Sequence, residues 1–300
     1  MARCTLTAAA KINFYLRILG RRSDGYHEVA MVLQSVTLRD VVHLTTHPGK
    51  TIDLHCDHPQ VPTDSTNLAV QAAQLLAARF PQAATGVTIH LEKHIPVAAG
   101  LAGGSSNGAA VLVGLNHLWG LGLTVGELQE LAAQLGSDMP FCVQGGTALA
   151  TGRGDILEPL PPLNGGALVL AKHRNLSIST PWAYRTYSEQ WGQTFGGVTD
   201  QADRFVQLLA QPDFSQIAAH LHNDFEKVVL PAYPEIAALK QALLATGALG
   251  ALLSGSGPTV FALYPDQATA QQAIVTLQAQ HPGVDFWRCE CCPWGIEWWA

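Results

Sequence analysis

The 300-residue sequence predicts an α+β protein with two domains, and three observations support this. The segment 5–54 alternates apolar and polar side chains, which is typical of half-buried strands. From residue 64 onward, helix-capping residues introduce helical patterns that alternate with short apolar strands. The closing segment 235–289 follows the order α-β-β-α-β, which indicates a ferredoxin-like layer. Because 48% of the residues are hydrophobic, the chain can bury a sizeable core.

Charge and hydropathy exclude several classes of partner. The net charge is −6, so we expect no nucleic-acid partner and no binding to an anionic membrane, although a local basic pocket for a phosphorylated ligand stays possible. Lys11 and Arg17 interrupt the N-terminal apolar run, which therefore lacks a secretory pattern. The most apolar window, 109–125, is too short and too broken to span a membrane. We expect a soluble, cytoplasmic protein.

The N-terminal half begins with strands, which the alternation places at 5–7, 12–16, 27–44, 52–54 and 87–91. Capping residues at 64–67 open a helix over 68–80, which Pro81 stops. A second helix is predicted over 109–119. Thr124 and Glu127 form a capping box for a third, which runs to Leu135. The segment 145–157 is typical of a hairpin.

A proline- and glycine-rich stretch over 159–166 is the best linker candidate, so we place the domains at 1–160 and 161–300. The second domain should contain a strand over 167–171 and several helices. Its predicted closing elements are a helix over 235–245, strands over 248–253 and 259–264, a helix over 268–279 and a strand over 284–289.

The stretch IPVAAGLAGGSSNGAAVLVGLN, residues 95–116, sets flexible glycines directly against a helix. The N–H groups at a helix N-terminus form an anion site, and glycines let the backbone approach phosphate oxygens. The pattern favours a polyphosphate-binding loop, although a glycine-rich turn before a core helix is the plainer interpretation. It also contains a G-x-S-x-G match at 104–108, the pattern of a serine hydrolase with Ser106 as nucleophile. Residues 99–103 separate that match from any apolar strand, which weakens this alternative.

Three stretches together resemble the GHMP kinase superfamily: AKINFYLRILGRRSDGYHEV at 10–29, the glycine loop, and LLSGSGPTVFALY at 252–264. The resemblance covers nearly the whole chain. It implies a ribosomal-S5-domain-2-like N-terminal half, a ferredoxin-like C-terminal half, and ATP-dependent phosphorylation of a small alcohol. AKIN followed by DGYHEV resembles the branch whose small-molecule substrate carries a cytidine diphosphate group. Where the superfamily loop usually has a glycine, this chain has Ala102; nucleotide binding would suffer if that position needs φ > 0.

The resemblance implies that Asp138 is the base that accepts the proton of the acceptor hydroxyl, and that Lys11 is its partner cation. The residues themselves leave other roles open: Asp138 follows Gly136 on a constrained turn and could simply cap the next helix, and Lys11 could be an exposed strand lysine. Asn13 shares a strand face with Lys11 and is expected to bind the same substrate.

The remaining site residues are also carried over from the resemblance. Those expected at the substrate are Asn13, Tyr26, His27, Thr180, Pro181 and Tyr184. Tyr26 and His27 would recognise the cytidine. The plainer roles are core packing for Tyr26 and an exposed surface ring for His27. Those expected at ATP are Asn67, Lys93, Pro96, Gly100, Gly103, Gly104, Ser105 and Ser106. The glycines of segment 255–259 are expected to shape the substrate cleft.

The sequence shows no carboxylate cage, so Mg²⁺ is expected to be held mainly through ATP phosphates, and no metal site of the protein itself is predicted. The six cysteines are expected to be free thiols, because the RCECCPW segment lacks the second ligand pair of a zinc site. Three alternatives stay open: a GHMP kinase for another small alcohol, a serine hydrolase using Ser106, and a nucleotide-binding protein without catalysis.

Overall fold

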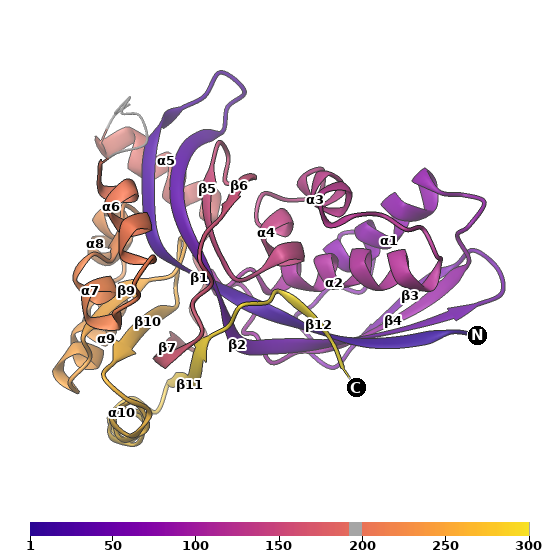
Figure 1. Cartoon of the computed structure of the whole chain (residues 1–300). Coiled ribbons are helices and arrows are strands. Elements are labelled where there is room, and N and C mark those ends of the chain that lie inside the picture. The colour runs from indigo at the N-terminus through magenta and orange to yellow at the C-terminus, as the bar shows by residue number, and fades with distance from the viewer. Residues whose placement is uncertain (192–199, 300) are drawn as a thin grey trace.

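The computed structural model describes residues 1–191 and 200–299. Its spine is a pair of long antiparallel strands, β1 (Arg3–Arg21) and β2 (His27–His47), which are paired along nearly their whole length. The sequence predicted two short strands where β1 is continuous. Three register shifts bend this ladder, so the same two strands serve both halves of the molecule (Figure 1).

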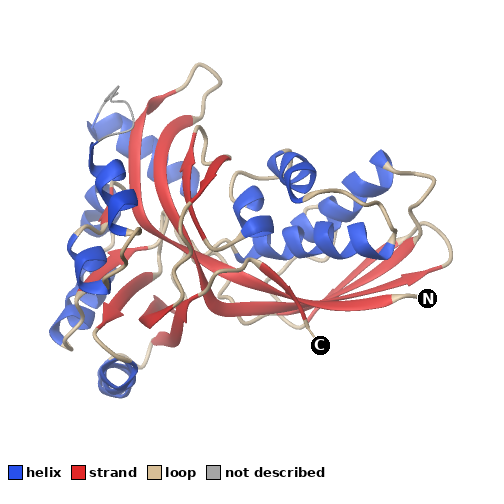
Figure 2. Ribbon diagram, viewed as in Figure 1, coloured by secondary structure: helices blue, strands red, loops and turns tan. Residues whose placement is uncertain are grey.

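Helices cover one face of the strands in the N-terminal half. The strands there are β3 (Ile52–Cys56), β4 (Gly86–Glu92), β5 (Thr147–Thr151) and β6 (Ile156–Pro159). The helices are α1 (Leu68–Arg79), α2 (Gly103–Leu118), α3 (Val125–Ala133) and α4 (Met139–Gln144). Strand residues such as Leu44, Ile89 and Leu91 form a buried core with α1 and α2. Figure 2 shows the opposite face of β3 and β4 open, with no helix over it among the described residues.

The C-terminal half contains a four-stranded antiparallel layer of order β11-β7-β10-β9. These strands are β7 (Gly165–His173), β9 (Gly250–Leu253), β10 (Val260–Tyr264) and β11 (Val284–Cys291). The helices are α5 (Thr180–Trp191), α6 (Asp200–Leu208), α7 (Phe214–Ala219), α8 (Glu226–Ala232), α9 (Pro234–Ala245) and α10 (Gln267–Gln280). The order matches the predicted ferredoxin-like layer.

Two short strands from the C-terminal part of the chain pair with β1. Strand β8 (His222–Asn223) pairs in parallel with β1, and β12 (Ile296–Trp298) pairs with its other end. Because β2 also pairs with β11, hydrogen-bonded strands run from one half into the other. The domain boundary at residue 160 therefore stays a prediction.

Several local expectations can be compared with the structure. Helix α2 starts at Gly103 rather than at Ala109, so the prediction of its start was wrong: the serines lie in its first turns instead of a preceding loop. The capping box at Thr124 and the β5–β6 hairpin are confirmed. All six cysteines are free, as expected, and the three in the RCECCPW segment are buried.

Among the described residues, no single helix has both the length and the apolar character needed to cross a membrane. The pair α8 and α9 meets that test only when counted together, and the two are bent by 107°.

Candidate active site

A cavity of about 1320 Å³ lies where the two halves meet. This volume exceeds that of a usual single-ligand pocket, so there is room for two ligands. Every predicted site residue except Ser106 lines it, namely Lys11, Asn13, Tyr26, His27, Asn67, Lys93, Pro96, Gly100, Gly103, Gly104, Ser105, Asp138, Thr180, Pro181 and Tyr184.

A lysine–aspartate pair lies in this cavity. The Nζ of Lys11 on β1 is 3.7 Å from Oδ2 of Asp138, and it donates a hydrogen bond of 3.0 Å to Oδ1 of Asn13. The lysine side chain is almost fully buried, whereas that of Asp138 is 36% exposed and open to a ligand. Asp138 precedes α4, but its side chain makes no capping hydrogen bond. The carboxylate is therefore available for chemistry.

The first turn of α2 points into the same cavity. The backbone N–H groups at 103–105 have no partner inside the helix, so they and the helix dipole favour an anion. Gly100, with φ of +76°, lies so close to the loop after β9 that a Cβ would collide with the carbonyl oxygen of Ser254. The Oγ of Ser254 also donates to the Gly100 carbonyl oxygen at 3.1 Å. The segment 254–259 therefore packs against the glycine loop. That its glycines shape the substrate cleft stays a prediction.

Ala102, the residue that departs from the superfamily pattern, has φ of +57° and ψ of +26°. This is the left-handed region, in which an alanine costs about 1–2 kcal/mol. The loop therefore keeps the conformation that glycine would favour, at the expense of local strain.

The neighbouring serines of α2 differ in their surroundings. Ser105 lines the cavity, whereas Ser106 is fully buried and its hydroxyl donates to the carbonyl oxygen of Ala9 at 2.7 Å. A hydrolase nucleophile must reach its substrate, so this placement disfavours the hydrolase alternative. A phosphate contact by the Ser106 hydroxyl stays a prediction.

A buried carboxylate that the sequence interpretation missed anchors the glycine loop. Asp40 on β2 has no exposed surface, and its Oδ1 accepts from the backbone N–H groups of His94 and Ile95 at 2.7 and 2.8 Å. Its Oδ2 accepts from Lys93 Nζ and from Asn107 Nδ2. The only sequence signal for this role is a charged residue inside an apolar strand.

Lys93 and Asn67 are thus already engaged in polar contacts where they line the cavity. The Lys93 ammonium donates to Asn107 Oδ1 at 2.9 Å as well as to Asp40, beside the start of α2. The Asn67 amide caps α1 through the N–H of Ala69 and donates to the Pro62 carbonyl. A direct contact of either residue with adenine stays a prediction.

Aromatic side chains gather at the other end of the cavity. The ring of His27, at the start of β2, stacks on Tyr184 of α5 with centroids 4.6 Å apart and an interplanar angle of 18°. Phe225 meets the Tyr184 ring edge-on at 4.8 Å. Tyr26 is 53% exposed, and the Arg153 guanidinium lies over its ring at 4.9 Å. Neither Phe225 nor Arg153 was predicted from the sequence.

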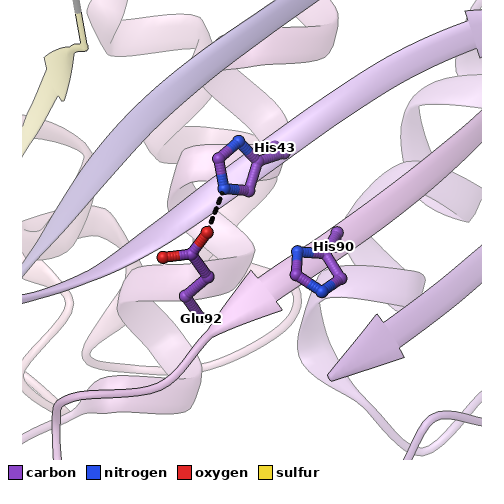
Figure 3. Close-up of side chains that lie close together, drawn as sticks. All are labelled: His43, His90 and Glu92. Carbon is purple, nitrogen blue, oxygen red and sulfur yellow. Dashed lines mark hydrogen bonds and ion pairs between the residues drawn. The ribbon is translucent and has the colours of Figure 1, made fainter. Parts of the chain in front are cut away.

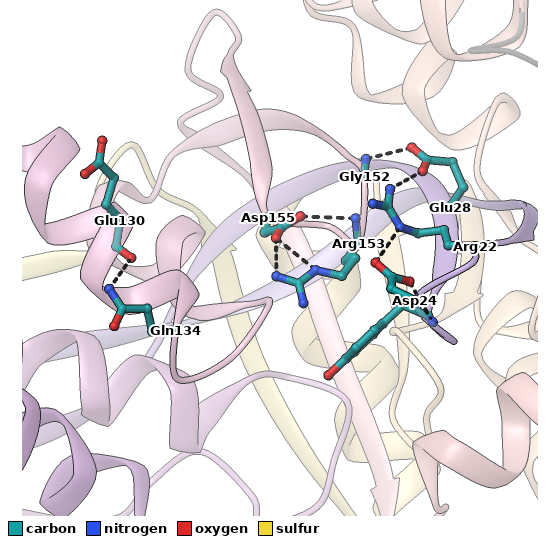
Figure 4. A network of polar contacts seen from close by, with 9 residues as sticks. Arg22, Asp24, Glu28, Glu130, Gln134, Gly152, Arg153 and Asp155 are labelled. Atoms are coloured by element: carbon teal, nitrogen blue, oxygen red, sulfur yellow. Dashed lines mark hydrogen bonds and ion pairs between the residues drawn. The ribbon is translucent and has the colours of Figure 1, made fainter.

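A polar network fixes the turn that carries Tyr26 and His27 (Figure 4). Arg22 pairs with Asp24 and with Glu28, and Glu28 also accepts from the N–H of Gly152 at 3.0 Å. This network joins the turn before β2 to the turn of the β5–β6 hairpin. The hairpin therefore supports the aromatic end of the cavity.

Hydrogen bonds define the polar character of the aromatic end. The hydroxyl of Ser188 donates to the Tyr184 carbonyl, so it accepts from Nε2–H of His27 at 2.7 Å. Nδ1 of His27 is then left as an acceptor. Burial, followed by the charge of Arg21, lowers the pKa of His27, which favours this neutral form. Burial and then the charge of Asp138 raise the pKa of Tyr184, so its phenol stays protonated.

Together, the fold and the cavity define a class of protein: a two-lobed enzyme that presents a helix N-terminus for phosphate beside an aspartate–lysine pair. The comparisons agree with this class. The model of the GHMP kinases N terminal domain matches residues 67–146, and that of the GHMP kinases C terminal domain matches residues 205–283. The chain belongs to the GHMP kinase family.

Close relatives share one name. A protein of Synechococcus sp. (strain JA-2-3B'a(2-13)), named 4-diphosphocytidyl-2-C-methyl-D-erythritol kinase, is 55% identical over 99% of this chain and 96% of its own length. One of the same name from Thermosynechococcus vestitus is 50% identical over 97% of this chain and 98% of its own length.

Solved structures extend the comparison. A crystal structure of 4-(cytidine 5'-diphospho)-2C-methyl-D-erythritol kinase is 30% identical, with a TM-score of 0.77, and the match covers 96% of this chain and 98% of that one. Homoserine kinase from Cytophaga hutchinsonii has a TM-score of 0.74 at 20% identity, covering 100% of this chain and 98% of its own. That likeness concerns the fold alone.

Proposed function

We propose that this chain transfers the γ-phosphoryl group of ATP to the 2-hydroxyl of 4-diphosphocytidyl-2-C-methyl-D-erythritol, giving ADP and the 2-phosphate. This reaction belongs to non-mevalonate isoprenoid precursor biosynthesis. The observation that carries the proposal is the Lys11–Asp138 pair, which lies between a phosphate-binding helix N-terminus and an aromatic pocket in one cavity. The names of relatives with at least 50% identity support the substrate.

In the proposed mechanism, the oxygen of the substrate hydroxyl attacks the γ-phosphorus, and Asp138 accepts the proton that this hydroxyl loses. Lys11 lies close enough to offset the negative charge that builds up on that oxygen. Asn13 fixes the ammonium through its Oδ1 and in turn donates from Nδ2 to the sulfur of Met31 at 3.4 Å. Phosphoryl transfer depends mainly on the position and charge of the groups around the reacting atoms. The Lys11 ammonium and the Asp138 carboxylate, which lie in fixed positions, therefore suit the reaction.

At the ATP end, the N–H groups at 103–105 would receive the phosphates, and the Asp40 anchor would keep the preceding backbone in place. The cavity fits Mg²⁺ bound to ATP, because it offers the hydroxyl of Ser105 and open space above Gly104 rather than a carboxylate cage. Bound in this way, Mg²⁺ would neutralise phosphate charge.

At the substrate end, Tyr184 would stack on the pyrimidine, and Nδ1 of His27 would accept a hydrogen bond from its exocyclic amino group. Tyr26, supported by Arg153, would face the pyrimidine from the other side. Thr180 and Ser256, which share a hydrogen bond of 2.8 Å, lie in the wall at the junction of the two halves. Because the reaction consumes ATP, we place it in the cytoplasm.

The test is ADP release by the purified protein with Mg·ATP and each of three acceptors: the cytidyl substrate, homoserine and mevalonate. We expect turnover of the cytidyl substrate alone. Asp138→Asn should lower kcat by about 10²-fold or more, as loss of a positioned base does. Asp266→Asn, which alters an exposed capping carboxylate of α10, is the matched control and should leave kcat unchanged.

Other outcomes would overturn parts of the proposal. Turnover of homoserine or mevalonate instead would identify a GHMP kinase for another alcohol. ATP binding without turnover in wild type and Asp138→Asn alike would leave only a nucleotide-binding protein.

A further inference from the structure

Two histidines and a glutamate gather on the open face of the N-terminal strands, away from the cavity (Figure 3). His43 on β2 and His90 on β4 are direct partners in the antiparallel ladder, and Glu92 lies two residues beyond His90. Successive side chains of a strand point to opposite faces, so these three share one face. Their neighbours Leu44, Ile89 and Leu91 lie in the core under the helices.

The donor atoms are close enough for one ion. One nitrogen of each histidine and one carboxylate oxygen of Glu92 all lie within 4.8 Å of one another. Nε2 of His43 is 2.7 Å from Oε1 of Glu92, and the two imidazole rings have centroids 5.6 Å apart. Ligands around a tetrahedral Zn²⁺ are separated by about 3.3 Å, given metal–ligand distances of about 2 Å. The separations in this structure are at most 4.8 Å, so they would have to shorten by about 1.5 Å at most for the three atoms to bind one ion.

A neighbouring strand prepares His43 for this role. Nδ1 of His43 is 3.0 Å from the hydroxyl of Thr5, its ladder partner on β1. Without a metal, Nε2 donates to the ionised Glu92 carboxylate, which can only accept, and Nδ1 accepts from the Thr5 hydroxyl. Because a hydroxyl can also accept, Nδ1 can take the ring proton when a metal binds the Nε2 lone pair. Such a hydrogen bond to the second nitrogen commonly orients metal-bound imidazoles. Lys93, which follows Glu92, pairs with Asp40 instead and does not compete for the glutamate.

We propose that His43, His90 and Glu92 form a site for Zn²⁺ or a similar divalent transition metal, completed by water. Two imidazoles and one carboxylate suit such borderline metals, whereas Mg²⁺ and Ca²⁺ prefer oxygen ligands only. The bound ion would join β2 to the end of β4. The site is separate from the phosphoryl-transfer cavity and does not depend on the proposed kinase reaction.

Isothermal titration of the metal-free full-length protein with Zn²⁺ tests this site. We expect one ion per chain and at least a tenfold loss of affinity in His90→Ala and in Glu92→Gln. His55→Ala is the matched control, because His55 is an exposed ladder neighbour of His90 outside the ligand set, and it should bind like wild type. Titration with Mg²⁺ should give no binding at this site, and ADP release with Mg·ATP should be the same in all three variants.

Co²⁺ provides a second readout that separates this site from the free thiols. We expect a cobalt spectrum without thiolate charge-transfer absorption, lost in His90→Ala. Thiolate absorption, unchanged affinity in both ligand variants, or an equal loss in His55→Ala would each overturn the proposal.

Discussion

The imidazole of His27 lies flat against the phenol ring of Tyr184, with ring centroids 4.6 Å apart. One ring belongs to the start of β2 and the other to α5, so this stack joins the two halves of the chain at the aromatic end of the cavity. If a pyrimidine takes the face of Tyr184 that His27 now covers, His27 must leave the stack and is then free to contact the polar edge of the base. Substrate binding would thus replace one aromatic contact with another.

Replacing Tyr184 tests this stack. Tyr184→Ala should raise KM for the cytidyl substrate about tenfold, since an aromatic pair contributes about 0.5–1.5 kcal/mol beyond simple burial. KM for ATP should stay within about twofold, because Tyr184 lies at the far end of the cavity from α2. Steady-state ADP release measures both constants. Tyr184→Phe keeps the ring and should resemble wild type; an equal effect of both variants would show that the hydroxyl, rather than stacking, matters.

The strained alanine of the glycine loop gives a second prediction. Ala102→Gly should raise the free energy of unfolding by about 0.5 kcal/mol, because relief of left-handed strain exceeds the added flexibility of the unfolded chain. Ala110→Gly, inside the same helix, should lower it by about 1 kcal/mol or more. Urea denaturation compares the two variants. Losses of similar size would contradict the strain at Ala102.

The buried carboxylate of Asp40, which anchors the glycine loop, gives a third prediction. Asp40→Asn would leave the Lys93 ammonium buried without its counter-charge, so it should lower the free energy of unfolding by about 3 kcal/mol. KM for ATP should also rise, since Asp40 holds the backbone that leads into the loop. Asp285→Asn breaks an exposed pair with Arg174 and should cost less than about 1 kcal/mol. Similar losses in both variants would refute the anchoring role.

A fourth prediction concerns acid stability. Burial of Asp224 raises its pKa, but hydrogen bonds from His222, Lys227 and the N–H of Ile18 outweigh burial, and the pKa lies well below its ordinary 3.8. The resulting stability is present above pH 3.8 and is lost as the pH falls toward the folded-state pKa. Asp224→Asn should therefore lower the free energy of unfolding by about 2 kcal/mol at pH 7.

Denaturation of wild type and Asp224→Asn at pH 7, 5 and 3 measures this dependence. The difference in the free energy of unfolding between the two proteins should be constant between pH 7 and 5 and should become smaller below pH 3.8. A difference that widens toward pH 3 would show that the carboxylate is not held in its ionised form.

Local patterns explain the parts of the fold that were predicted. Helix α3 (Val125–Ala133) has its capping box, and the closing α-β-β-α-β order depends on short-range periodicity that the sequence displays directly. The start of α2 was misplaced because glycines and serines have weak helix propensity, whereas the structure packs Ser106, Asn107 and Gly108 inside the molecule. Burial of these residues, rather than intrinsic helix propensity, therefore stabilises the start of α2.

The sequence by itself determined which chemical groups are present and roughly which elements carry them: the glycine loop before a helix, the Lys11–Asn13 strand and the Asp138 turn. Only the tertiary structure decided which of them meet. Helical rotation of about 100° per residue turns Ser105 to the cavity and buries Ser106, a difference that composition cannot show. The Asp40 anchor and the His43–His90 pair depend on ladder register between segments far apart in the chain, which is fixed by burial of their apolar neighbours.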